Sequence, residues 1–162
     1  MSQVDIIQRI VDRGRTFSRF EPYIRYIRFP HYKQLLDGER INFDFPLTVL
    51  VGPNGCNKSS VLKALYGCPR GKSTGVYWFS TDVDVINEDD GRHCCIQGYY
   101  SESAGRVVES LKTRIRIPSD PDYWETSRPI LEYGMDPMPD RIPGPDRSKT
   151  RWKAIRRNVL YL

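Results

Sequence analysis

The sequence predicts an α/β fold, in which a buried strand, a glycine-rich loop and a helix pack against an antiparallel β layer. The apolar run 47–51 stops abruptly at Gly52, as a strand buried on both faces would. Val61, Leu62 and Leu65 then recur at helical spacing. Several β-rich runs separated by turn residues follow, and they supply the second layer.

Length and composition favour a single folded domain. The chain has 162 residues, of which 39% are hydrophobic and 28% charged, and these values argue against disorder and against a membrane protein. The first residues lack the apolar core and cleavage site of a signal peptide, so we expect a cytoplasmic protein with no membrane partner. The net charge of +5 is compatible with nucleotides or nucleic acid as partners.

The chain divides into a short leading segment and the domain itself. Val4, Ile7 and Val11 share a helical face, which predicts an amphipathic helix within residues 1–20 that docks on the domain or on a partner. The remaining residues, 21–162, are assigned to one domain. Four cysteines, two of them adjacent, do not form a disulfide framework, so we expect reduced thiols.

The first half of the domain should contain two strands before the buried one. Residues 23–29 are aromatic and β-branched, and residues 41–45 alternate between apolar and polar. A turn at Asp37 and Gly38 connects them. The strand predicted at 47–51 is the expected centre of the sheet.

The second half should be mostly β. Residues 76–79, 83–86, 92–100 and 107–117 are predicted strands, with a helix start at 107–111 as an alternative. Seven of the twelve prolines fall within 118–145, which predicts an irregular segment. Residues 147–162 have spacing for a helix, and their apolar end could instead begin a buried strand.

One motif carries chemistry. It matches the phosphate-binding pattern G-x-x-x-x-G-K-[ST], except that asparagine replaces the second glycine. Its residues are Gly52, Pro53, Asn54, Gly55, Cys56, Asn57, Lys58, Ser59 and Ser60. Backbone amides and the following helix N-terminus form an anion site, Lys58 reaches the terminal phosphates as the catalytic cation, and Ser59 holds magnesium.

The departure at Asn57 predicts weakened or altered nucleotide binding, because its side chain adds bulk beside the phosphates. If position 57 has a positive φ, asparagine is the least costly replacement for glycine. A turn that merely joins strand to helix is the structural alternative for the whole motif.

Other polar clusters are less specific. The acidic residues between 82 and 90 are best interpreted as a solvated loop, and His93, Cys94 and Cys95 as structural residues. The basic cluster within 147–157, with Trp152 inside it, could contact a nucleic-acid backbone or form a solvated helix face.

Residues 26–66 resemble the N-terminal lobe of ABC-type ATPases in the SMC, RecF and OLD group. The resemblance implies ATP and Mg²⁺ as ligands, with the region from Phe29 to Tyr32 beside the adenine. It implies a glutamine as a second magnesium ligand, for which Gln97 is the candidate, and an ordinary strand glutamine is the alternative for this residue. It also implies a head-to-tail second protomer, an association with DNA, and in some members a nuclease partner and antiphage defence.

The departures from that group define the alternatives. The chain lacks the hydrophobic strand ending in Asp-Glu and the signature serine that an ABC site needs, so we expect an incomplete domain that hydrolyses ATP only with a second lobe. The isolated 162 residues are not expected to be an enzyme. The alternative is a nonhydrolytic or vestigial nucleotide-binding module that works through a protein partner. A small phosphate-loop kinase is a weaker rival, because the middle of the chain is β-rich.

Overall fold

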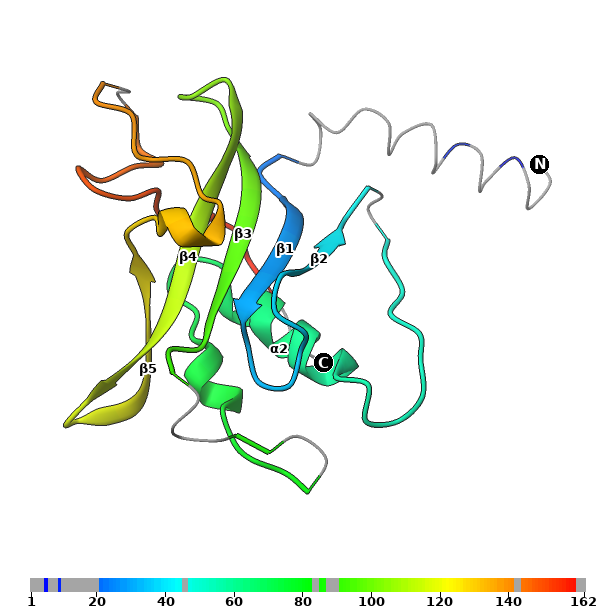
Figure 1. Cartoon of the computed structure of the whole chain (residues 1–162). Helices are drawn as coiled ribbons and strands as arrows, with labels where there is room; N and C mark the ends of the chain where they lie inside the picture. The colour runs from blue at the N-terminus through cyan, green and yellow to red at the C-terminus, as the bar shows by residue number, and fades with distance from the viewer. Residues whose placement is uncertain are drawn as a thin grey trace.

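The fold is built on an antiparallel sheet. The computed structural model describes residues 5, 9, 21–44, 47–82, 85–86, 91–141 and 144–159. Five strands pair in the order β2-β1-β3-β4-β5, and each pair is antiparallel (Figure 1). They are β1 (Ile24–His31), β2 (Glu39–Asn42), β3 (Cys94–Ser101), β4 (Arg106–Ile117) and β5 (Asp120–Ser127). The helix α2 (Lys58–Gly67) lies against this sheet, which confirms the predicted mixture of a helix with an antiparallel layer.

Alternation along the strands separates two faces of the sheet. Ile27 pairs with Gln97 and points toward α2, whereas Arg28 pairs with Ile96 and points to the opposite face. Successive side chains of a strand must take opposite faces, so this register fixes which residues lie beneath the helix.

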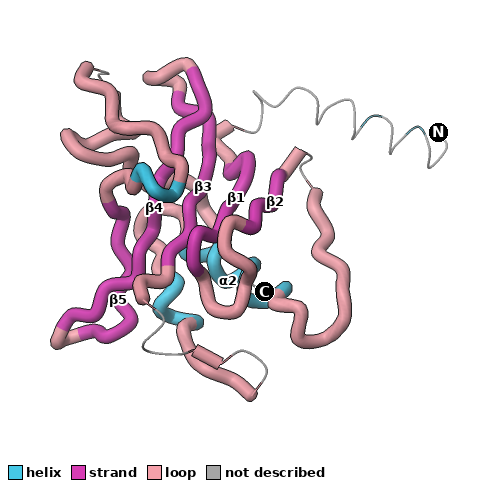
Figure 2. The backbone as a smooth tube through the Cα atoms, viewed as in Figure 1, coloured by secondary structure: helices cyan, strands magenta, loops and turns pink. Residues whose placement is uncertain are grey.

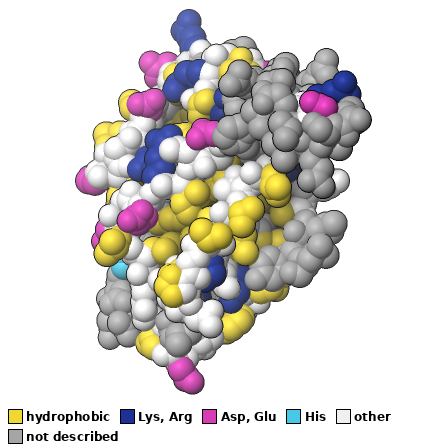
Figure 3. All heavy atoms as spheres, turned by 90° about the vertical axis from the view of Figure 1, so that its right-hand side faces the viewer, with side chains coloured by type: hydrophobic (Ala, Val, Ile, Leu, Met, Phe, Trp, Pro, Cys, Tyr) yellow, Lys and Arg dark blue, Asp and Glu magenta, His cyan; other side chains and the backbone are white. Residues whose placement is uncertain are grey.

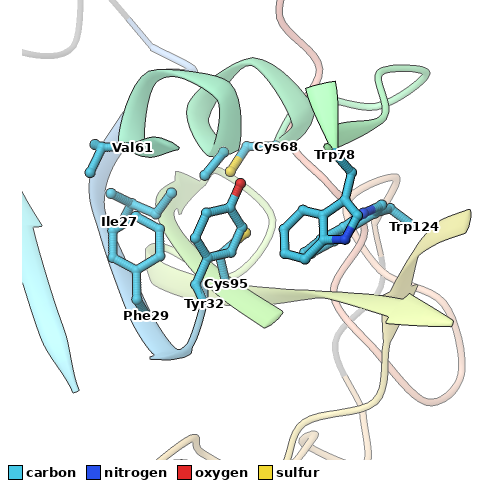
Figure 4. Packing of buried hydrophobic residues seen from close by; sticks show 9 residues of the cluster. Ile27, Phe29, Tyr32, Val61, Cys68, Trp78, Cys95 and Trp124 are labelled. Carbon is cyan, nitrogen blue, oxygen red and sulfur yellow. The ribbon is translucent and has the colours of Figure 1, made fainter. Parts of the chain in front are cut away.

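The main core fills the space between α2 and the sheet. Val61 and Ala64 on the helix pack against Ile27 and Phe29 of β1 (Figure 4). The core continues into an aromatic cluster, in which Trp78 lies 5.4 Å from Tyr32 and 5.1 Å from Trp124, measured between ring centroids. The short 3₁₀ helix η2 (Thr74–Tyr77) brings Trp78 to this position.

The opposite face combines a polar network with a smaller core. The Arg28 guanidinium forms two 2.8 Å hydrogen bonds with the Glu109 carboxylate, and the Tyr26 hydroxyl donates to the same carboxylate at 2.9 Å. Ile96 and Leu111 are covered by Met135, which follows the 3₁₀ helix η3 (Leu131–Tyr133).

The prediction of a central strand at 47–51 is wrong, because these residues form no strand in the described structure. These residues form an irregular segment (Figure 2), and Leu47, Val49 and Val51 are 78%, 70% and 84% exposed. Figure 3 shows hydrophobic side chains gathered on the surface of one face of the molecule. A strand buried on both faces needs neighbouring strands and a covering layer. The described sheet ends at β2, and no described strand pairs with 47–51, so only Leu50 packs against the core.

Several other elements differ from expectation. Residues 76–79 lie partly in η2 instead of a strand, and 83–84 are outside the described residues. β5 forms inside the segment predicted to be irregular, because its edge position tolerates Pro121 while Trp124 packs inward. Described residues of 147–159 contain neither a helix nor a strand beyond an isolated bridge between Arg147 and Trp152.

The remaining elements agree with the predictions from the sequence or lie wholly or partly outside the described residues. The strand alternative for 107–117 is confirmed by β4, the predicted helix by α2, and the strands at 23–29 and 92–100 by β1 and β3. The strand predicted at 41–45 is shorter, since β2 ends at Asn42 and residue 45 is not described. Of the helix predicted within 1–20, only Asp5 and Arg9 are described, and both are helical. Among the described helices, none is long and apolar enough to cross a membrane.

Gly98 provides a test of the packing on the second face. A Cβ at this position would lie 2.2 Å from the Tyr26 ring, so Gly98→Ala should lower the free energy of unfolding by about 1–3 kcal/mol through overpacking. Urea denaturation of the wild type, both single variants and the double variant with Tyr26→Ala measures this. Removing the ring should abolish most of the Gly98→Ala penalty, and an undiminished penalty in the double variant would contradict the packing.

Candidate functional site

The loop between 52 and 57 has the backbone conformation that its sequence requires. Gly52, Gly55 and Asn57 have φ values of 155°, 84° and 61°, and Asn57 has ψ of 17°. Position 57 therefore lies in the left-handed region, where asparagine is the least costly substitute for glycine. The departure from the motif preserves the turn that leads into α2.

Gly52 is needed for a second reason. A Cβ at this residue would lie 2.7 Å from the Cys56 Sγ atom, in addition to the strain of a positive φ. Gly52 thus lies close to the Cys56 side chain, and glycine allows this approach together with the positive φ.

Lys58 closes the loop from the helix side. Its Nζ donates to the carbonyl oxygens of Gly52 at 2.8 Å and Pro53 at 2.7 Å, and lies 3.5 Å from the Cys56 Sγ atom. The ammonium group is thereby held over the loop, where Lys58 is half-buried and residues 52–56 are exposed. A cation in this position can reach an anion seated on the loop.

The beginning of α2 favours an anion electrostatically. The first helical hydrogen bond runs from the Val61 N–H to the Asn57 carbonyl, and the Asn57 side chain makes no cap hydrogen bond. The first turn contains no acidic residue, so the positive end of the helix dipole is not neutralised there. Ser59 is exposed beside this end, whereas Ser60 is buried beneath the helix.

Gln97, the predicted second magnesium ligand, is not brought to the loop. Its side chain is fully buried in the middle of β3, and its Nε2 donates to the Cys68 carbonyl at 2.9 Å. Cys68 follows the last residue of α2, so the carbonyl that Gln97 binds lies about 13–14 Å along the helix axis from Ser59. In this structure the Gln97 side chain supplies a hydrogen bond to a backbone carbonyl at the C-terminal end of the helix. Its position in the sequence did not predict this contact.

The aromatic residues expected beside an adenine are also part of the core. Phe29 and Tyr32 are 1% and 0% exposed, and their rings pack against each other at 5.3 Å between centroids. Neither ring faces solvent, so the structure does not place them beside the loop as base-stacking surfaces. Trp152 in the basic cluster is likewise buried, which contradicts the idea that it stacks on a nucleic acid.

The cysteines divide into one exposed and three buried thiols. Cys56 is exposed on the loop, and Cys68, Cys94 and Cys95 are buried. Burial raises the pKa of Cys94 to about 12, and the hydrogen bond with Cys68, together with burial, raises the pKa of Cys95. The Cys94 and Cys95 thiols are therefore protonated, as suits structural residues.

Two basic residues outside the predicted cluster join it in space. Arg70 follows α2, and Lys112 points from β4 toward the helix side of the sheet. Both line one cavity with Arg151 and Lys153. The inward position of Lys112 could have been deduced from alternation along β4, but its proximity to the C-terminal segment could not.

Comparison with known proteins adds two matches. The sequence profile described as an AAA domain matches residues 27–128. The DNA replication and repair protein RecF of Clostridium kluyveri is 35% identical over 68 residues, which cover 42% of this chain and 17% of that protein. The chain thus spans well under two thirds of this relative. No solved structure matches the chain.

The left-handed position in the loop can be tested by stability. Asn57→Val should lower the free energy of unfolding by about 1–2 kcal/mol, because a β-branched residue is strained at a φ of 61°. Asn57→Gly should be neutral or slightly stabilising. Asn54→Val is the matched control, since Asn54 lies in the same exposed loop without a positive φ. Equal effects of the two valine substitutions in urea denaturation would contradict the assignment.

Proposed function

The chain belongs to the AAA domain family, and from this we propose that it is the nucleotide-binding first lobe of an SMC/RecF-like ATPase. ATP with Mg²⁺ binds on residues 52–60 in this proposal. The observation that carries it is the loop itself, in which Asn57 supplies the left-handed turn and Lys58 is held over the entrance of α2. A turn that only joined two elements would not need a lysine bonded to its first carbonyls.

The residues present fit a triphosphate and its magnesium ion. Loop amides and the uncapped start of α2 supply donors for phosphate oxygens, and the Lys58 ammonium moves from its carbonyl partners to the terminal phosphates. The exposed hydroxyl of Ser59 is the proposed magnesium ligand. The bound ion neutralises phosphate charge and orients the nucleotide. Gln97 is not part of this site.

Hydrolysis requires groups from elsewhere in this proposal. Among the described residues, no group of three or more His, Cys, Asp or Glu side chains is arranged to hold a metal ion. The carboxylates for the reaction would come from a second lobe, and a second protomer bound head to tail would complete the site. The chain alone would then bind ATP without turning it over.

The biological setting is proposed from the resemblance. The matched relative is named as a DNA replication and repair protein, which supports DNA as a partner of the complete ATPase. A nuclease partner and a role in antiphage defence are proposed from the resemblance alone, and a cytoplasmic location from the lack of signal-peptide features in the first residues.

A nonhydrolytic interaction module is the second candidate. The specific observation in its favour is the row of exposed apolar side chains at Leu47, Val49 and Val51, which is suited to contact with another protein. Under this alternative, nucleotide binding at the loop is weak or absent.

Substitutions at the loop separate these functions. Lys58→Ala should weaken ATP binding about 10- to 100-fold, the effect of losing charge-assisted hydrogen bonds. Asn57→Gly should strengthen binding, because it removes side-chain bulk and keeps the turn. Lys149→Ala, an exposed lysine outside the loop, is the control. Isothermal titration with a nonhydrolysable ATP analogue and Mg²⁺ measures all four proteins, and a Lys58→Ala affinity equal to that of the wild type would overturn the proposal.

Magnesium removal tests the role of Ser59. Chelation with EDTA should reduce the affinity of the wild type for the analogue several-fold, because the ion links the hydroxyl to the phosphates. Ser59→Ala should start from that reduced affinity and respond little to EDTA. The neighbouring Ser60→Ala is not a suitable control because Ser60 is buried, so Ser80→Ala, an exposed serine elsewhere, is used. An unchanged EDTA response in Ser59→Ala would exclude the hydroxyl as a ligand.

A further inference from the structure

A basic cavity lies at the end of α2 that is opposite the loop. Its volume is about 220 Å³, and four cationic side chains line it together with two hydroxyl groups. The cations are Arg70, Lys112, Arg151 and Lys153, and the hydroxyls belong to Thr126 and Ser148. We call these residues the basic pocket.

We propose that the basic pocket binds a phosphate group, at a site separate from the loop at 52–60. The lining residues include four cations and no carboxylate, and none of the four forms an ion pair with a carboxylate within the part of the chain that is described. Arginine forks and the Thr126 hydroxyl suit the oxygens of a phosphate, and a bound anion would balance the charge of this cluster.

Lys112 gives the strongest indication of a ligand. It is only 5% exposed, and its Nζ donates to the Lys72 carbonyl at 3.2 Å. Burial lowers the pKa of its ammonium group, and the nearby Cys95 thiol does not balance the charge, because the raised pKa of that thiol keeps it protonated. A buried cation without an anion is costly, and a bound phosphate would offset that cost.

The backbone around the basic pocket is held in place before any ligand binds. The Arg70 N–H donates to the Ile155 carbonyl at 2.8 Å, which fixes the C-terminal segment beside the end of α2. The Ser148 N–H donates to the Arg151 carbonyl at 2.9 Å, and the buried side chains of Trp152 and Ile155 anchor the same segment. Positioned donors lose less entropy on binding than flexible ones.

The size and surroundings indicate the class of ligand. The volume lies below the range of about 300–1,000 Å³ typical of sites for larger organic ligands, so one phosphate group fits better than a whole nucleotide. Arg70 also lines a second cavity of about 510 Å³ with Arg156 and Arg157. The phosphate could therefore belong to a nucleic-acid strand that continues across these arginines, or to a small free phosphate.

The test compares charge removal inside and outside the basic pocket. All proteins are the full chain with Lys58→Ala, so that the loop lysine does not contribute to phosphate binding. The outcome at the basic pocket then does not depend on whether ATP binds at the loop. Arg70→Gln with Arg151→Gln should lower the affinity for inorganic phosphate at least tenfold in isothermal titration at 150 mM salt. Arg92→Gln with Arg141→Gln removes the same charge from exposed positions outside the pocket and should leave the affinity within twofold.

Lys112→Met supplies an independent readout. Phosphate should raise the melting temperature of the Lys58→Ala protein and of the control, and this increase should disappear in Lys112→Met. If the Lys112→Met protein does not fold, the variant with Arg70→Gln and Arg151→Gln still tests the proposal. Equal losses in the pocket and control variants, or no binding of phosphate at millimolar concentrations, would overturn the proposal.

A fluorescein-labelled 12-nucleotide DNA strand distinguishes the sources of the phosphate. If the strand binds, is displaced by inorganic phosphate and loses affinity only in the pocket variant, the ligand is a nucleic-acid phosphate. If phosphate binding depends on the pocket but strand binding is equal in all variants, the ligand is a small phosphate. Both results support the pocket as a phosphate site.

Discussion

The contact between α2 and the helix-facing side of β1 and β3 is the constraint on which the rest depends. Val61 and Ala64 pack on Ile27 and Phe29, so the helix cannot slide along the sheet without opening the core. Gln97 adds a buried hydrogen bond to the Cys68 carbonyl at the far end of the helix. One rigid helix therefore fixes the positions of two cationic sites, the loop at its beginning and the basic pocket at its end.

The two ends use cations in different ways. Lys58 is held by carbonyl groups of its own loop and remains at the surface, where water can solvate its charge. Lys112 is enclosed by the sheet and the C-terminal segment, so its charge is poorly solvated. An anion at the loop would replace the carbonyl groups that Lys58 now contacts. An anion in the basic pocket would instead supply a countercharge for Lys112 that the described residues lack.

Local patterns in the sequence predicted local structure well. The strands β1, β3 and β4 follow from their apolar and β-branched residues, and the turn at Asn57 follows from the motif, because both depend on neighbouring residues in the chain. Sequence alone did not identify Gln97 as the partner of a helix end, nor the approach of Lys112 to Arg151. Those contacts depend on strand register and on the path of the C-terminal segment, which no local pattern encodes.

Residues 47–51 show why a correct pattern can give a wrong element. The run Leu47, Thr48, Val49, Leu50 and Val51 has the composition of a strand buried on both faces, yet only Leu50 packs against the core. Burial is a property of the surroundings, and the described sheet ends at β2 without offering this segment a partner strand. If the chain is the first lobe of an ATPase, as we propose, strands from the second lobe would supply those surroundings. The apolar composition of 47–51 would then suit burial within the complete ATPase of that proposal. The exposure of these residues would be a property of the first lobe by itself.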